Sequence, residues 1–190
     1  MSAALQKLVT WLSPAFPVGA FAWSAGLETA IADGRVRDAE KLAEWIEGAL
    51  RHGGIRTDAI FLAHAHRSFG DSAALAELAD LSLALTASRE RWMETTITGD
   101  SYVTATKAWP AETLAVLPSP CPYPIAVGAI AGAHEIGLRD TLLAWLTATV
   151  HGQVSVAVRL VPLGQSDGLR VMAGLEPAIA QLAEAAANAG

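Results

Sequence analysis

Apolar residues recur at helical spacing along most of this chain, and no long stretch alternates between apolar and polar residues. In residues 75–85, leucines return every three or four positions, which is typical of one face of an amphipathic helix. The pattern predicts an all-α fold, a bundle of about eight to ten helices. The 190 residues are enough for one domain with a full core, and we expect residues 1–190 to form it.

Helix boundaries follow from residues that cap or break helices. We expect Asp38, Asp71 or its neighbour Ser72, and Asp140 to cap three of the helices, because a short polar side chain satisfies free backbone N–H groups. Residues 100–109 are ambiguous between loop and further helix. The expected helices cover residues 5–12, 23–32, 39–53, 57–68, 72–85, 88–98, 125–136, 140–160 and 167–187.

Two features predict how these helices pack. Residues 140–160 are apolar on nearly all sides, which indicates a buried helix near the centre of the bundle. Gly128 and Gly132 lie four positions apart, so a second helix is expected to approach closely there. In residues 72–85, the leucines Leu75, Leu78, Leu81 and Leu85 are expected to point inward.

The composition of the chain indicates in which compartment it works and which kinds of partner it can bind. The chain is 52% hydrophobic with a mean hydropathy of +0.34, so it is expected to hide apolar surface against itself or a partner. A membrane span is not expected, because residues 113–134 contain four prolines and residues 141–158 contain a polar stretch around His151. No secretory signal is recognisable, and we expect a cytoplasmic protein. A net charge of −6 without a basic block argues against nucleic acid as a partner.

Residues 13–28 combine prolines, glycines and aromatics and end in Glu28, which predicts a rigid turn rather than a linker. Residues 22–26 differ by one position from the G-x-S-x-G nucleophile elbow, so a serine hydrolase using Ser24, with Asp140 and His151, is an alternative function. That elbow requires a preceding strand, and none is visible. A capping or turn role for Ser24 is therefore favoured.

Apart from Ser24, few residues in the sequence are candidates for catalysis, metal binding or partner binding. The histidines lack metal-ligand spacing and Cys121 is the only cysteine, so no metal or cofactor is expected. Arg89, Glu90, Arg91 and Glu94 form a charged group in which Glu90 and Glu94 lie on one helix face. We interpret it as a recognition surface, with solvated or arginine-paired charge and paired-carboxylate catalysis as alternatives. Arg159 lies in an apolar stretch. Either its stem packs and its head reaches water, or it pairs with Glu28 or Glu90 in one polar cluster that includes Arg89.

Three stretches, in this order, resemble the urease accessory protein UreF: residues 13–28, residues 88–90 and residues 157–165. The resemblance covers nearly the whole chain and implies an all-α, non-enzymatic protein that forms a homodimer. It implies the partners UreD (also called UreH), the GTPase UreG and the urease apoprotein, which receives nickel. The partner-binding residues that it implies are Pro17, Gly19, Trp23, Ser24, Glu28, Arg89, Glu90, Arg159 and Gln165.

The sequence departs from the UreF pattern at two places. Ala20 stands where the family commonly has glycine, and Ala22 precedes Trp23 where a serine is frequent. Family members also commonly continue beyond the last helix into a charged tail that helps to bind UreD. The affinity for that partner, or the mode of binding, is therefore expected to differ here.

Overall fold

The computed structural model describes residues 2–189, which form nine α-helices and two short 3₁₀ helices and contain no strand. The prediction of an all-α bundle is confirmed. In chain order the elements are α1 (Ser2–Trp11), η1 (Ala20–Ala22), α2 (Leu27–Ala32), α3 (Ala39–His52), α4 (Gly54–Arg67), α5 (Ser72–Ala84), α6 (Arg89–Thr106), η2 (Glu112–Ala115), α7 (Tyr123–Ala133), α8 (Leu138–Leu160) and α9 (Gln165–Ala187).

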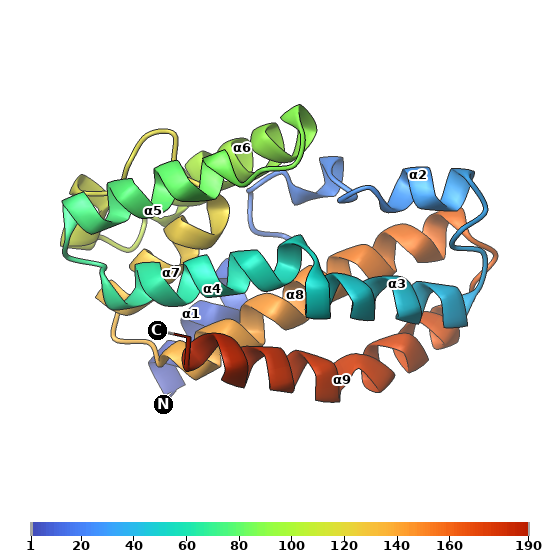
Figure 1. Cartoon of the computed structure of the whole chain (residues 1–190). Coiled ribbons are helices and arrows are strands. Elements are labelled where there is room, and N and C mark those ends of the chain that lie inside the picture. Colours follow the sequence, from blue (N-terminus) through green and yellow to red (C-terminus); the bar gives the residue numbers. More distant parts are fainter. Residues whose placement is uncertain (1, 190) are drawn as a thin grey trace.

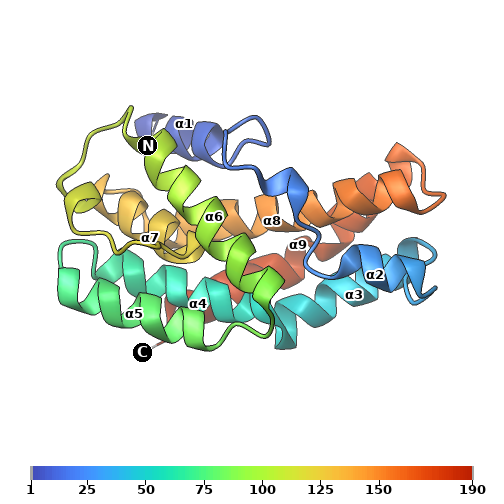
Figure 2. The same cartoon turned by 90° about the horizontal axis from the view of Figure 1, so that it is seen from above.

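The helices form an elongated bundle (Figure 1). The two longest helices, α8 and α9, pack against each other, and α3 and α4 follow one another in a row that packs against α9. Helix α7 lies between α4 and α6, with α5 outside them (Figure 2). The segment that contains η1 and α2 crosses from α1 to the opposite end of the bundle, where α2 packs against α8.

The core is most complete around α7. Nearly all of its side chains are buried, because its alanines and glycines allow the flanking helices to come close. A Cβ atom at Gly128 would lie 2.2 Å from the Leu62 carbonyl oxygen, and one at Gly132 would lie 2.5 Å from the His66 carbonyl oxygen. Both distances are far below van der Waals contact, so α4 and α7 touch backbone to backbone. The predicted close approach at these glycines is confirmed.

Helix α8 runs along the length of the bundle and packs against α9, α2, α4 and α7. By length and composition alone it is apolar enough to cross a membrane, and half of its most apolar window is buried inside the bundle. Two leucines at its ends, Leu143 and Leu160, are 44% and 50% exposed. The predicted buried helix is therefore present, with one face that still reaches solvent.

Three local predictions need correction. Helix α2 begins at Leu27 rather than near residue 23, because Ala25 and Gly26 adopt left-handed backbone angles that a helix cannot include. Asp140 does not cap α8: the N-cap is Gly137, and Asp140 lies in the first turn. Leu81 and Leu85 do not point inward but are 53% and 61% exposed.

The caps predicted for α3 and α5 are confirmed. The Asp38 carboxylate accepts a hydrogen bond from the Lys41 N–H at 2.8 Å. The Asp71 carboxylate accepts from the N–H groups of Ala73 and Ala74, at 3.0 and 3.1 Å. Residues 100–106, which were ambiguous, continue α6 as helix.

Candidate docking surface

The first predicted stretch is a turn anchored by two buried side chains. Phe16 and Val18 are buried, and the Phe16 ring lies 5.6 Å from the Tyr102 ring, centroid to centroid. Between and after them, Pro17 and Gly19 are exposed. Gly19 has φ of 72°, a left-handed angle at which a side chain would be strained. The stretch therefore forms a turn that is anchored in the core by two side chains, and the expected linker-free entry into α2 is present.

The end of this stretch carries the residues that were singled out from the sequence. Trp23 and Ser24 are half-buried, and Glu28 is exposed on the first turn of α2. The Ser24 hydroxyl oxygen accepts a hydrogen bond from the Glu28 N–H at 3.5 Å. The N-cap of α2 is Gly26, which makes no side-chain cap bond, so Ser24 lies in the turn two residues before the cap. Within residues 2–189 no strand precedes it, so the nucleophile elbow is not formed.

The second stretch is the N-terminal end of α6. Ser88 is the N-cap, and its side-chain oxygen accepts from the Arg91 N–H at 3.1 Å. Arg89 and Glu90 are both exposed. Hydrogen bonds from the Glu90 backbone N–H and from the Ser88 hydroxyl lower the pKa of the Glu90 carboxyl, so Glu90 is ionised at neutral pH. This turn presents one positive and one negative side chain to solvent, next to Trp92, which is 42% exposed.

Sequence reasoning placed Arg91 and Glu94 in the charged group at this turn but missed their partner Asp58, which lies on α4. The Arg91 guanidinium donates to the carboxylate of Asp58 on α4, and it also forms a salt bridge of 2.9 Å with Glu94 one turn along α6. The Arg91 and Asp58 side chains are only 27% and 17% exposed. Burial raises the pKa of the Asp58 carboxyl to about 6, and Arg91 opposes that increase. Asp58 is the only acid in α4, and that was the one available signal.

The third stretch joins the end of α8 to the start of α9. Arg159 lies in the last turn of α8, and Gln165 is the first residue of α9; both are exposed. Gly168, one turn into α9, approaches α8 closely, because a Cβ there would lie 2.9 Å from a Val158 methyl group. The connection between the two helices is therefore held tightly, while its polar side chains remain available.

The predicted polar cluster of Glu28, Arg89, Glu90 and Arg159 does not form. No salt bridge within the described chain joins any two of them, and Arg159 has no acidic partner there. The four residues lie on three different helices, α2, α6 and α8, and each of the four side chains is exposed to solvent. The alternative in which the Arg159 head reaches water agrees with the structure.

The three stretches nevertheless lie in one half of the bundle. In both views the N-terminal end of α6 lies near the segment between η1 and α2 (Figures 1 and 2). Helix α2 packs against α8, whose C-terminal end lies at the same end of the molecule as α2. Residues more than 130 positions apart in the chain therefore lie along the same part of the bundle, with the start of α6 near its middle and the end of α8 at the end that carries α2.

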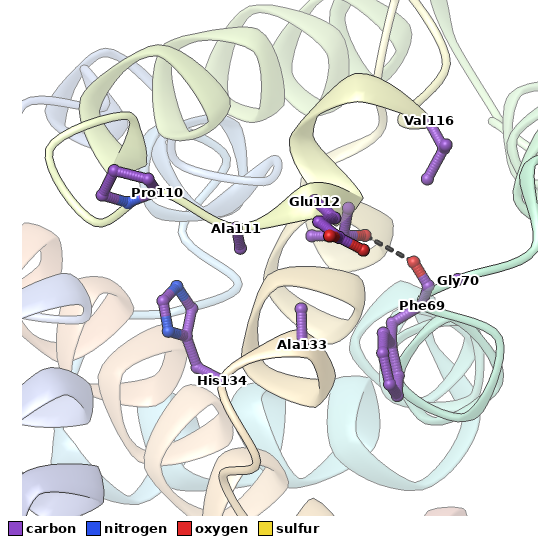
Figure 3. A pocket seen from close by; sticks show the side chains of 9 residues that line it. Phe69, Gly70, Pro110, Ala111, Glu112, Val116, Ala133 and His134 are labelled. Carbon is purple, nitrogen blue, oxygen red and sulfur yellow. Dashed lines mark hydrogen bonds between the residues drawn. The ribbon is translucent and has the colours of Figure 1, made fainter.

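A separate hollow of about 350 Å³ lies at the other end, where α4, η2 and α7 meet (Figure 3). His134 lines it and is held by two contacts: Lys7 Nζ lies 3.2 Å from its Nδ1, and the Trp109 carbonyl lies 3.3 Å from its Nε2. Burial and the Lys7 charge lower the pKa of His134. None of the predicted residues lines this hollow. Within the described residues, no group of three or more His, Cys, Asp or Glu is arranged to hold a metal ion.

Together, the fold and the exposed residues define an all-α protein whose distinctive polar side chains lie on helix ends and tight connections, where they are open to contact. The comparisons with known proteins identify it further. A family model described as UreF matches residues 36–176. The chain belongs to the UreF family of urease accessory proteins, as its three stretches had indicated.

The curated relatives extend the match to the first stretch. The urease accessory protein UreF of Agrobacterium fabrum is 50% identical over 185 residues, which is 97% of this chain and 83% of the relative. The protein of the same name from Rhizobium etli strain CIAT 652 is 50% identical over 184 residues, covering 97% and 82%. The one from Methylobacterium sp. strain 4-46 is also 50% identical, covering 96% and 76%.

Proposed function

We propose that this protein is a cytoplasmic scaffold for urease maturation. In this proposal it binds the accessory protein UreD (UreH) and the GTPase UreG and supports the delivery of nickel to apo-urease. It acts as a homodimer and performs no catalysis of its own. The observation that carries the proposal is family membership combined with the exposure of all three UreF-like stretches on one half of the bundle.

The chemistry of these stretches suits a protein partner. Glu28, Arg89, Glu90 and Arg159 are exposed charges without salt-bridge partners in the described chain, so a partner can pair with them without first breaking an internal salt bridge. Trp23, in the same stretch as Glu28, is half-buried. Tryptophan and arginine are enriched among residues that dominate binding energy at interfaces. A rigid turn also loses little conformational entropy when it binds.

The direct test is co-elution with the UreD and UreG homologues of the same organism, followed by urease activity in a deletion strain grown at limiting nickel. The proposal expects a stable complex and inactive, nickel-poor urease in the deletion strain. Normal nickel-loaded urease in that strain would overturn it. Light scattering of the purified protein tests the homodimer separately.

Point variants locate the binding surface. Glu28→Ala and the double change Arg89→Ala with Glu90→Ala are each expected to weaken the complex at least about tenfold, as hot-spot truncations do. Glu176→Ala is the matched control, because Glu176 is exposed on α9 and lies outside the three stretches. Equal affinity for all of these variants would show that the stretches are not the docking surface.

A further inference from the structure

We infer that Arg91 is a positioning residue: through Asp58 and Glu94 it fixes the first turn of α6, and thereby orients Arg89 and Glu90 for partner binding. The inference rests on the proposed function, because it concerns the same docking surface. It adds three residues to that surface that none of the UreF-like stretches contains.

The geometry of Arg91 suits this role. Its backbone N–H donates to the Ser88 cap, while the two terminal nitrogens of its guanidinium reach different carboxylates. One of these carboxylates, on Asp58, belongs to α4, and the other, on Glu94, belongs to α6 itself. The donors of a planar guanidinium have fixed positions, so they constrain both the direction and the distance of the carboxylates that they bind. Arg91 therefore ties the cap, the turn and the neighbouring helix together.

Further along α6, two contacts hold the helix against the segment that begins α7. The Thr95 hydroxyl accepts a hydrogen bond from the Tyr123 N–H at 3.2 Å, and a Cβ at Gly99 would lie 1.9 Å from the Cys121 carbonyl oxygen. Both contacts hold the middle of α6 against the start of α7. Before them, Ser88, Arg89, Glu90 and Trp92 are exposed. Without Arg91, the first turn is attached mainly through the rest of its own helix.

The burial of Arg91 and Asp58 argues against a role for their salt bridge in stability alone. A largely buried ion pair gives back in desolvation most of what it gains in attraction, so replacing the whole pair by apolar residues is often neutral for stability, whereas removing only one partner leaves the other charge buried and unpaired. Asp58 shows that cost, because its burial raises the pKa of its carboxyl. Buried charged groups are best attested where they fix one arrangement among several, and the orientation of an exposed motif is such an arrangement.

The consequence for binding is quantitative. If only a fraction of molecules holds the first turn in the binding arrangement, the apparent Kd rises by the inverse of that fraction. Arg91→Met keeps the length of the side chain and removes both salt bridges. We expect it to weaken binding to the UreD and UreG homologues by about tenfold, which corresponds to about one molecule in ten with the turn correctly placed.

The experiment compares Arg91→Met with Arg139→Met in titrations against the purified homologues. Arg139 is the matched control, because its salt bridge with Glu184 also joins two helices but lies on the surface at the opposite end of α8. Hydrogen exchange of residues 88–92 is measured for the unbound proteins. We expect faster exchange there and weaker binding for Arg91→Met alone, with Arg91→Lys intermediate because lysine reaches only one carboxylate at a time.

Three results separate the possible failures. If the wild type binds neither homologue, the proposed function fails. If the wild type binds and the double change Arg89→Ala with Glu90→Ala leaves binding intact, the docking surface is wrong and the inference about Arg91 is overturned with it, while the proposed function stands. If that double change abolishes binding while Arg91→Met binds like Arg139→Met, the positioning role is wrong and the docking surface stands. If Arg91→Met does not fold, Asp58→Asn serves instead, because it keeps the side-chain shape, and unchanged binding and exchange would overturn the inference.

Discussion

The close crossing of α4 and α7 at Gly128 leads to the sharpest prediction for stability. Replacing Gly128 by alanine places a methyl group 2.2 Å from the Leu62 carbonyl oxygen and 3.1 Å from the His66 backbone nitrogen. Ordinary contacts of a Cβ atom begin at 3.4 Å. The obstacles are backbone atoms of a packed helix, so no side chain can rotate away. The two helices must separate by about 1 Å at their crossing, and packing is lost along both.

The magnitude follows from two opposing terms. Overpacking of a core costs about 1–3 kcal/mol, and backbone obstacles place Gly128→Ala near the upper end. Alanine is a better helix former than glycine by about 0.5–1 kcal/mol, which offsets part of that cost. We therefore expect a net loss of about 2 kcal/mol. For a chain of this size, that loss lowers Tm by about 4–8 °C.

The assay is thermal and urea unfolding followed by circular dichroism, with Gly48→Ala as the matched control. Gly48 lies inside α3, and a Cβ there would meet nothing within 4 Å. Only the helix-propensity term acts at that position, so Gly48→Ala is expected to raise stability by about 0.5–1 kcal/mol. The two identical substitutions should therefore have opposite signs. If Gly128→Ala also stabilises the protein, the backbone contact between α4 and α7 is wrong.

Three further predictions concern single side chains. Asp71→Ala removes the cap of α5 and is expected to cost about 1 kcal/mol, measured by urea unfolding; no loss would refute the cap. Burial lowers the pKa of His66, whose Nε2 lies 2.7 Å from the Ile136 carbonyl oxygen, so the unfolded chain binds its proton more readily. The stability that this shift contributes is complete above the pKa of the unfolded chain, about 6.5, and is lost as pH falls toward the pKa of the folded protein. Lowering the pH from 7.5 to 5.5 should therefore destabilise the wild type more than His66→Gln, measured by urea unfolding at both pH values. Burial raises the pKa of the Cys121 thiol to about 12, so Ellman's reagent should label it only when the chain unfolds in urea; rapid labelling of the folded protein would contradict its burial.

Most helices could be predicted because hydrogen bonds between nearby side chains and backbone groups determine where they begin. Asp38, Asp71 and Ser88 cap helices with their own side chains, and these interactions need no distant partner. The close approach at Gly128 was also predictable, because glycines at helical spacing have few other uses inside a helix. The UreF-like stretches were recognisable from residue order alone, and the family match agrees with them.

Features that depend on tertiary packing could not be predicted in this way. Leu81 follows Leu75 by six residues, so at 3.6 residues per turn it points about 120° away from it, and the buried face of α5 is formed by Leu75, Ala79 and Ser82 instead. The salt bridge between Arg91 and Asp58 joins positions 33 residues apart, and only the fold brings them together. The expected pairing of Arg159 was wrong for the same reason, since its exposure depends on where α8 ends in the bundle.

The backbone contact between α4 and α7 has a consequence beyond stability. Leu62, which touches Gly128, lies one turn after Asp58 on α4, a rise of about 6 Å. A helix seated in that groove cannot slide or rotate, so the carboxylate that orients the start of α6 is fixed relative to the whole bundle. Because Gly128 and Gly132 on buried α7 have no Cβ atom, α4 can pack closely enough to hold Asp58, and with it the exposed first turn of α6, in one orientation. A screen for variants that lose partner binding should therefore recover changes at Gly128 and Gly132, although no partner can reach either residue.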